Sequence, residues 1–468
     1  MKFALFDWSN SDDRRFALLI SFLVLVFLTG GGSRNDVQSL AILQPLAFIF
    51  AAAGLIVAGK QQLKRLGLPL TLLAVLAAIV LLQLIPLPPT IWHMLPGREP
   101  IIASGELLGL DNVWRPISLS PASTWSSLFF LAIPLAAMIL FAIQSRLHQR
   151  RLIGFFIGIA LASSILAILQ LSSPEGSVFY LYRVTNDGAA VGLFANRNHH
   201  AMYLACAILM AFWYAASLDK ADKHMAIKGV FAAVSLMVFL PMIFVIGSRA
   251  GLLLGFVCIV LGFYFILRSE LFGKSRFLSW MPDSKFGVAI PIALLLGFSL
   301  MAIATQMTDN ATALDRLIGQ NSIDELRISL LPTLLEMVNE FWVIGAGFGS
   351  FELVYKSFEP QSLLSTKYLN MAHNDLVQLI VEAGLAGILL IVIFAIWLIT
   401  KSIDIAKSST PKRPSRQLMS LLLILIWGIA SLFDYPMRVP SLAAFFAILC
   451  CMVAMNRSSD HRLSRKDY

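Results

Sequence analysis

Residues 371–387 place a histidine, an asparagine and two carboxylates at the start of a long apolar segment. His373 is a candidate general base towards a hydroxyl group, because a neutral imidazole accepts a proton near pH 7. Asn374 suits a helix N-cap, and Asp375 is favourable in a first helical turn without any catalytic role. Glu382 falls on the same helix face as Asp375, about two turns into the apolar segment. The residues alone leave two roles open for His373, a general base or a histidine at a helix start, and Glu382 is either part of a site or a structural carboxylate.

Several arginines, one of them with a nearby acid, also lie where apolar segments meet polar loops. A guanidinium group is always charged and can direct two donors onto phosphate oxygens, so arginines on one side of a membrane suit a lipid diphosphate. Each arginine can equally contact a lipid headgroup or a helix end. Arg249 is the most informative, because it stands in a tight Gly-Ser-Arg-Ala-Gly turn between two apolar segments. The full set is Arg183, Arg197, Arg249, Arg316, Arg327 and the pair Asp434 and Arg438.

A metal site, a phosphate loop and a disulfide framework are three possibilities that the sequence does not favour. His199 and His200 lack a suitably spaced carboxylate or cysteine, so neither a metal nor another cofactor is predicted; arginines can stabilise a departing diphosphate instead. Residues 345–349 are rich in glycine but lack the strand, the helix and the Lys-Ser/Thr ending of a phosphate loop, which favours a flexible turn. The four cysteines fall in apolar runs and are predicted to be packing residues: Cys206, Cys258, Cys450 and Cys451.

The composition is typical of a membrane protein. Of the 468 residues, 58% are hydrophobic and only 13% are charged, whereas soluble chains carry about 25% charged residues. Apolar runs of roughly 15 to 25 residues recur along the chain, and each can cross a hydrocarbon core of about 30 Å as a helix. The sequence therefore predicts an all-α, polytopic membrane protein, with a single membrane domain over residues 1–468.

The apolar runs predict about twelve membrane-spanning helices. The first follows Arg14 and Arg15, but Asp12 and Asp13 precede it and no small-residue cleavage site follows, so we expect an uncleaved span and not a signal peptide. The first span and the last two are the shortest. The predicted spans cover residues 16–31, 40–58, 68–85, 125–143, 152–171, 199–216, 229–246, 250–267, 286–304, 376–400, 417–433 and 441–455.

The positions of the basic residues predict the topology. Most of the 36 Lys and Arg residues fall on segments that are cytoplasmic if both termini are cytoplasmic, as the positive-inside rule requires. The net charge of +9 therefore reports membrane orientation and not a nucleic-acid partner. The long loops 86–124, 172–198 and 305–372 then lie on the outer side.

The loop 305–372 is too long for a simple connector and is predicted to be partly helical. Ser322 and Glu325 match a capping box, and apolar residues recur at helical spacing from Leu326 to Val338. Pro332 is expected to kink this helix or to begin a second one.

Taken in order, the motifs resemble those of the O-antigen ligase and O-antigen polymerase superfamily. Residues 114–119 look like the segment before an early span, and residues 192–201 are similar to the motif G-x-F-x-N-x-N-x-x-A. Residues 248–251 match a Ser-Arg-x-Gly turn. Arg327, the glycines of residues 345–349 and residues 373–387 resemble the large outer loop and the helix after it, and residues 434–438 resemble an element near the end of many members. The resemblance covers most of the chain from residue 114 onward.

The resemblance implies an activity and roles for individual residues. Members are bacterial integral membrane enzymes that transfer glycans from undecaprenyl diphosphate on the periplasmic side of the inner membrane. The large-loop histidine is held to activate the acceptor hydroxyl and arginines bind the diphosphate, which implies His373 as the base. The implied diphosphate contacts are Arg249, Arg183 and Arg327, with Arg197 at a variable position of its motif. The implied supporting residues are Asn196, Asn198, Asn374, Asp375, Glu382, Asp434 and Arg438.

Several alternatives stay open at this point. The acceptor is another glycan chain, a lipid A core or a protein hydroxyl, corresponding to a polymerase, a ligase or a protein oligosaccharyltransferase. Direct displacement at the anomeric carbon predicts inversion. A twelve-span transporter or flippase is the alternative from another class, and it favours two related halves with broken helices or polar groups near the bilayer midplane. The sequence shows neither halves nor a midplane charge cluster, and it leaves the sugar and the oligomeric state open.

Overall fold

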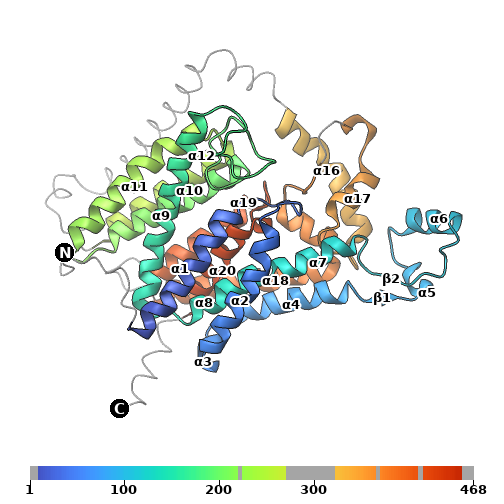
Figure 1. The fold of residues 1–468 in the computed structure, drawn as a ribbon, viewed down its shortest axis with the longest axis horizontal. Helices are drawn as coiled ribbons and strands as arrows, with labels where there is room; N and C mark the ends of the chain where they lie inside the picture. Colours follow the sequence, from blue (N-terminus) through green and yellow to red (C-terminus); the bar gives the residue numbers. More distant parts are fainter. Residues whose placement is uncertain (1–8, 220–223, 270–321, 365–368, 409–414, 456–468) are drawn as a thin grey trace. The chain divides into compact units, whose positions relative to one another are not determined.

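The protein is almost entirely helical. The computed structural model describes residues 9–219, 224–269, 322–364, 369–408 and 415–455, excepting the side chains of residues 322–328 and 408 (Figure 1). Within these residues, strands are limited to β1 (Pro86–Leu87) and β2 (Arg115–Pro116), which pair antiparallel. The predicted helical fold is confirmed. The predicted span 286–304 and Arg316 lie outside the described residues.

Seven helices in the described ranges are long and apolar enough to cross a membrane. Three shorter apolar helices, α4 (Leu68–Leu82), α19 (Arg416–Ala430) and α20 (Pro440–Ala454), coincide with further predicted spans. Helix α1 (Ser11–Thr29) opens on four consecutive charged residues and is not among the seven. The total of about twelve stays a prediction. The seven are α2 (Leu40–Val57), α7 with α8 (Pro121–Phe130 and Ala132–Ala142), α9 (Arg146–Leu171), α10 (Arg197–Ala216), α11 (Met225–Val245), α12 (Arg249–Leu267) and α18 (Asp375–Ser408).

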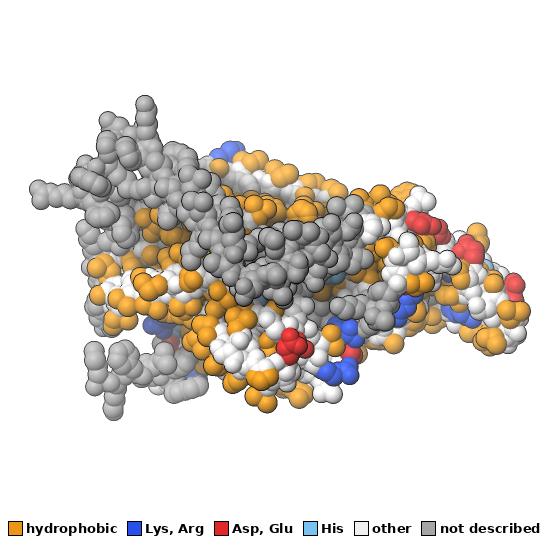
Figure 2. Space-filling model, turned by 90° about the horizontal axis from the view of Figure 1, so that it is seen from above, with side chains coloured by type: hydrophobic (Ala, Val, Ile, Leu, Met, Phe, Trp, Pro, Cys, Tyr) orange, Lys and Arg blue, Asp and Glu red, His pale blue; other side chains and the backbone are white. Residues whose placement is uncertain are grey.

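Large apolar side chains point outward from several of these helices. Ile56 on α2 is 87% exposed, Met237 on α11 is 75% exposed and Ile399 on α18 is 60% exposed. Hydrophobic side chains likewise occupy much of the face seen in Figure 2. Apolar surface is unfavourable in water but not in lipid. The chain is therefore a membrane protein.

The helices form two compact units. The first comprises Met1–Gly32, Gln144–Ser322 and Ser402–Ala430. Its centre is α10, which is apolar around most of its circumference and packs against α9, α11, α12 and α19. Cys206 on α10 and Cys258 on α12 are buried without a disulfide, as are Cys450 and Cys451 on α20, so the prediction that the cysteines are packing residues is confirmed.

The second unit comprises Ser33–Ile143, Ile323–Lys401 and Ser431–Tyr468. Its centre is α8, which packs against α2 and α20. The segment between α4 and α7 carries two short helices, α5 (Pro89–Trp92) and α6 (Glu99–Leu107), and β1 pairs with β2 at its base. A short helix, α3 (Lys60–Lys64), connects α2 to α4.

The described part of the loop 305–372 is partly helical, as predicted. Helix α16 (Ser322–Phe341) continues through Pro332, so a second helix does not begin there. One face of α16 buries Leu330, Leu334 and Met337 in a core shared with α17 (Phe351–Phe358), and this burial offsets the hydrogen bond that a proline removes. The side chains of the predicted capping box lie outside the described residues.

Helix α18 is broken at Gly384. This residue has φ 58° and ψ −139°, which interrupts the helical path. A Cβ atom at this position would lie 2.6 Å from the carbonyl oxygen of Val343, so the position requires glycine. Residues 385–408 are long enough on their own to cross a core of about 30 Å at about 1.5 Å per residue. The break therefore leaves a longer C-terminal part of α18 that can cross the membrane without the first part.

The glycine-rich turn of residues 345–349 packs against this break. The amides of Ala346 and Gly347 donate to the carbonyls of Val381 (2.8 Å) and Glu382 (3.0 Å). These carbonyls lose their helical partners where α18 breaks, so the turn replaces the missing hydrogen bonds. Residues 345–349 thus form a turn, as predicted, and their positive-φ glycines allow a buried backbone contact that the sequence pattern does not reveal.

Candidate active site

His373 has an uncommon backbone conformation. Its φ is 51°, and it is the one non-glycine residue with positive φ in the part of the chain that the structure describes. Such a conformation is uncommon for residues other than glycine and persists where neighbouring contacts determine it. Here the side-chain carbonyl of Gln378 accepts from the amide of Ala372 at 3.0 Å, and Asn374 begins α18 on the other side.

Asn374 is the N-cap of α18. Its Oδ1 accepts from the amides of Leu376 and Val377, both at 3.1 Å, and its Nδ2 donates to the carbonyl of Leu432 at 3.1 Å. The predicted capping role is therefore confirmed. The same contacts tie the start of α18 to the segment after α19.

The imidazole of His373 faces that segment as well. Its Nδ1 lies 3.5 Å from Oδ1 of Asp434, and its ring contacts the edge of Tyr435 with a centroid distance of 4.8 Å. The histidine side chain remains 23% exposed, so a small ligand can reach it. A carboxylate beside one ring nitrogen favours the neutral tautomer that carries its proton on that nitrogen.

An arginine binds both carboxylates of the first part of α18. Arg438 donates from Nη1 to Glu382 at 2.8 Å, and its Nε lies 3.8 Å from Asp375. Asp375 also accepts from the Ser431 hydroxyl at 3.0 Å and from the amide of Met437 at 3.1 Å. The two acids lie on one helix face, as predicted, and their contacts hold the segment that carries Asp434 against α18.

Gln378 and Gln83 are two residues that the sequence reasoning missed. The amide of Gln378 donates to Glu382 at 3.0 Å and holds the backbone next to His373. Gln83 ends α4 and bonds to the break in α18. Gln378 falls one turn before Glu382 in the sequence, which is a usable signal, whereas no sequence pattern connects Gln83 to α18.

The first unit places the starts of α10 and α12 side by side. Asn196 caps α10, and Ser248 caps α12 by accepting from Gly251 at 3.1 Å. The Ser248 hydroxyl also donates to Oδ1 of Asn198 at 2.8 Å. A Cβ atom on Gly251 would lie 2.3 Å from Ala201, so the glycine permits this close approach.

This arrangement explains the spacing of two motifs, because Asn198 and Ala201 of the first contact Ser248 and Gly251 of the second. Arg197 and Arg249 are the first residues of the two helices. Adjacent helix N-termini that each begin with an arginine favour an anionic ligand, since both the helix dipoles and the guanidinium groups are positive there. Both arginines also interact with other residues of the protein.

Residues 188–392 match the protein family described as O-antigen ligase. This chain contains an O-antigen ligase domain. The resemblance inferred from the motifs is thereby confirmed. No curated protein matches the chain.

The O-antigen ligase domain contains Arg197, Arg249, Arg327 and His373, whereas Asp434 and Arg438 follow the matched residues. The matched family is one of glycosyl transfer in the assembly of surface polysaccharides. The site beside His373 is thus built from the domain together with the segment after α19.

Arg183 and Arg327 are the two other predicted diphosphate contacts. The structure describes the side chain of Arg183 but not that of Arg327. Arg183 is exposed in the segment between α9 and α10, beside the buried Tyr182, whose hydroxyl accepts from the amide of Gly31 at 2.5 Å. Burial raises the pKa of Tyr182 to about 12. Arg327 lies in α16, and its side chain is outside the described residues.

The two adjacent histidines on α10 are buried. Nδ1 of His200 lies 2.8 Å from the carbonyl oxygen of Ala190, and the ring stacks on Phe194. In the described part of the chain, no three His, Cys, Asp or Glu residues gather in a way that could hold a metal ion. We assign His200 a packing role.

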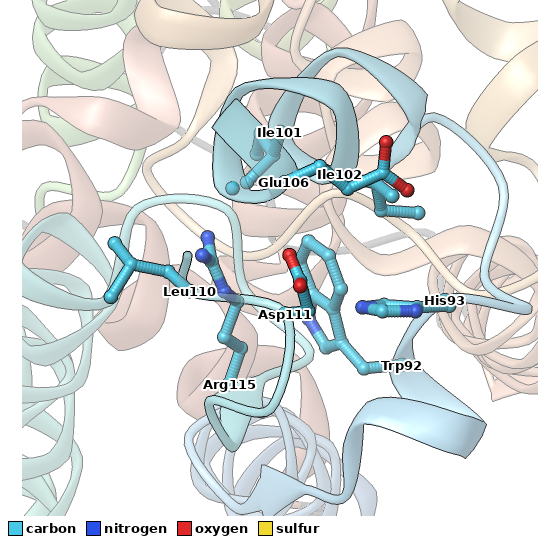
Figure 3. Close-up of a pocket in the computed structure, with 9 residues that line it drawn as sticks. Trp92, His93, Ile101, Ile102, Glu106, Leu110, Asp111 and Arg115 are labelled. Carbon is cyan, nitrogen blue, oxygen red and sulfur yellow. The ribbon is translucent and has the colours of Figure 1, made fainter. Parts of the chain in front are cut away.

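A cleft elsewhere in the second unit contains none of the predicted site residues. Figure 3 shows Glu106, Asp111, Arg115 and His93 around the ring of Trp92. The guanidinium of Arg115 lies 5.4 Å from the centroid of that ring. This contact fixes the segment between β1 and β2, and the cleft has no part in the proposal below.

Proposed function

We propose that this protein transfers an undecaprenyl-diphosphate-linked oligo- or polysaccharide to an acceptor hydroxyl at the periplasmic face of the inner membrane. The observation that carries the proposal is His373, which lies within the O-antigen ligase domain, is held at positive φ and faces the carboxylate of Asp434. These features suit a general base that is fixed in place and remains accessible.

His373 takes the proton of the acceptor hydroxyl as its oxygen forms a bond to the anomeric carbon. The bond from that carbon to the diphosphate oxygen breaks, and the diphosphate leaves with the electron pair. Nδ1 faces the Asp434 carboxylate, which leaves Nε2 as the nitrogen that we assign to accept the proton. Direct displacement inverts the anomeric centre, and no metal is required.

The leaving diphosphate carries negative charge that must be stabilised. We assign this role to Arg249 and Arg197 at the starts of α12 and α10, where arginine charge adds to the helix dipoles. Arg183 and Arg327 are assigned by their resemblance to the family's arginines alone. Asn196 and Asn198 support these helix starts, and Asn374, Asp375, Glu382 and Arg438 support the segment of His373.

A transporter is the second candidate, and the broken helix α18 is the observation that favours it, because transporters place broken helices at their substrate sites. In such sites, freed backbone groups bind the substrate or its coupling ion. Here the carbonyls of Val381 and Glu382 already accept from the glycine turn. The break therefore supports a fixed site more than a transport pathway.

One experiment tests the proposed function. Detergent-purified protein is incubated with a polyprenyl-diphosphate oligosaccharide and with a glycan, a lipid A core or a peptide acceptor, and products are identified by mass spectrometry. We expect transfer without a sealed compartment, and the productive acceptor distinguishes polymerase, ligase and oligosaccharyltransferase. Absence of transfer, combined with movement of the lipid-linked glycan in sealed vesicles, would instead support the transporter.

A further inference from the structure

Gln83 bonds to two backbone groups from distant parts of the second unit. Its side chain is buried at the end of α4, where only 3% of the residue is exposed. Nε2 donates to the carbonyl of Glu382 at 2.8 Å, and Oε1 accepts from the amide of Phe348 at 3.0 Å. One amide side chain thus joins the broken helix α18 to the glycine turn packed against it.

Gln83 supplies a hydrogen-bond partner to each of these two backbone groups. The helical path breaks at Gly384, two residues after Glu382, and the Glu382 carbonyl accepts from the amide of Gly347 at 3.0 Å as well as from Gln83. Phe348 packs with Val80 and Ala383 in a small apolar cluster that excludes water. An unpaired amide there is costly, so Gln83 cannot be replaced by an apolar residue without local opening.

Hydrogen bonds continue from Gln83 to the backbone of His373. The carboxylate of Glu382 accepts from Gln378 at 3.0 Å, and Gln378 in turn accepts from the amide of Ala372 at 3.0 Å. The opposite oxygen of Glu382 accepts from Arg438 at 2.8 Å. Gln83 therefore bonds to the backbone of Glu382, while Gln378 and Arg438 bond to its side chain.

We infer that Gln83 is a positioning residue for His373, acting through Glu382 and the break in α18. This role rests on the proposed function. Gln83 contributes no atom to the reaction, and it fixes the first part of α18 so that His373 keeps its conformation beside Asp434.

Two substitutions separate this role from a general contribution to folding. Gln83→Met fills the space but removes both hydrogen bonds. Gln83→Glu retains an acceptor for Phe348, but only the protonated carboxyl group can donate to the Glu382 carbonyl. Protonation of this carboxyl group as the pH falls should therefore restore the native contact. Among the described hydrogen-bond partners of Gln83, only Glu382 has a titratable side chain, and its carboxylate binds Arg438 and Gln378.

Hydrogen–deuterium exchange on the full-length protein measures the local contact directly. We expect Gln83→Met to speed exchange in peptides covering residues 345–350 and 381–388 by roughly tenfold, the effect of one unpaired buried group. Gln83→Glu should match the native rates near pH 5.5 and exchange faster near pH 8, where the ionised carboxyl group no longer donates to the Glu382 carbonyl. The exposed Gln61→Met is the matched control. Native exchange rates in Gln83→Met would overturn the inference.

Glycan transfer measured on the same samples tests the link to His373. Per folded molecule, Gln83→Met should lower kcat with little change in KM, and the activity of Gln83→Glu relative to native protein should fall as the pH rises. If both variants exchange hydrogen faster than native protein but keep the native kcat, Gln83 does not position His373. If native protein transfers no glycan to any acceptor, the proposed function fails, and with it the positioning role, while the exchange data still decide whether Gln83 closes the break.

Discussion

The chemistry proposed for this protein depends on a few side chains with unusual settings for a membrane protein. His373 combines positive φ, partial exposure and a carboxylate neighbour, and none of these features is explained by packing alone. The sequence indicated the histidine and its neighbouring acids. It did not indicate that Asp434, more than fifty residues later, would lie within 3.5 Å of its ring.

Replacement of His373 by alanine should lower glycan transfer by roughly 100- to 10,000-fold, the usual contribution of a general base. Membrane insertion should be unaffected, because Asn374 still caps α18. The measurement is product formation per folded molecule of purified protein. His93→Ala, at an exposed histidine of the second unit, is the control, and near-normal transfer by the His373 variant would remove the base role.

Replacement of Arg249 by alanine should weaken donor binding by roughly 10- to 100-fold, since a hydrogen bond to a charged group contributes about 1.5–3 kcal/mol. The measurement is the Kd for the polyprenyl-diphosphate donor. Arg268→Ala provides a matched control, because it removes an arginine just beyond the other end of the same helix. Equal donor affinity in both variants would contradict the assignment of Arg249.

At the scale of elements, contacts between distant segments hold two helix starts and one helix break in place. The starts of α10 and α12 are joined by Ser248 and Asn198, and the break in α18 is closed by the glycine turn and Gln83. Sequence periodicity predicted the helices but not these contacts, because it reports which residues face a core and not which distant backbone groups they meet.

The break in α18 predicts a contrast between two glycines. Gly384→Ala should destabilise the protein by about 1–3 kcal/mol, because alanine is strained at positive φ and its Cβ meets the Val343 carbonyl. Gly428→Ala in α19 meets no atom within 4 Å and should be neutral or slightly stabilising. Thermal unfolding in detergent compares the two. Equal unfolding temperatures for the two variants would show that the protein does not require positive φ at Gly384.

The contact of Tyr182 with the end of α1 predicts a dependence on alkaline pH. The folded protein holds the pKa of Tyr182 at about 12, above the ordinary value of 10. Its contribution to stability is therefore complete below pH 10 and is lost as the pH rises towards 12. Tyr182→Phe should be less stable at pH 8, and its deficit should shrink above pH 10. Tyr264→Phe, at an exposed tyrosine, should show no such change.

At the scale of the whole molecule, the composition and the exposed apolar helices both indicate a membrane protein. The orientation is a separate prediction that depends on the basic residues. It is also the prediction that places His373 on the periplasmic side.

Reporter fusions test that orientation. Alkaline phosphatase fused after Asp111 should be active, because the positive-inside rule puts residues 86–124 outside. Fused after Lys64 it should be inactive, and a fluorescent protein at the C-terminus should fluoresce in the cytoplasm. Phosphatase activity at Lys64 would reverse the topology and place the proposed site on the wrong side for its donor.

The sequence by itself determined the helical membrane class, most helix boundaries and the family, since all three depend on local composition, periodicity and short motifs. It also identified His373, the candidate arginines and the capping residue Asn374. Only the tertiary structure decided that Asp434 faces His373, that Arg438 binds both acids of α18, and that the glycine-rich turn is a buried clamp. The physical reason is that these contacts join segments far apart in the chain, and several use backbone groups whose partners no side-chain pattern specifies.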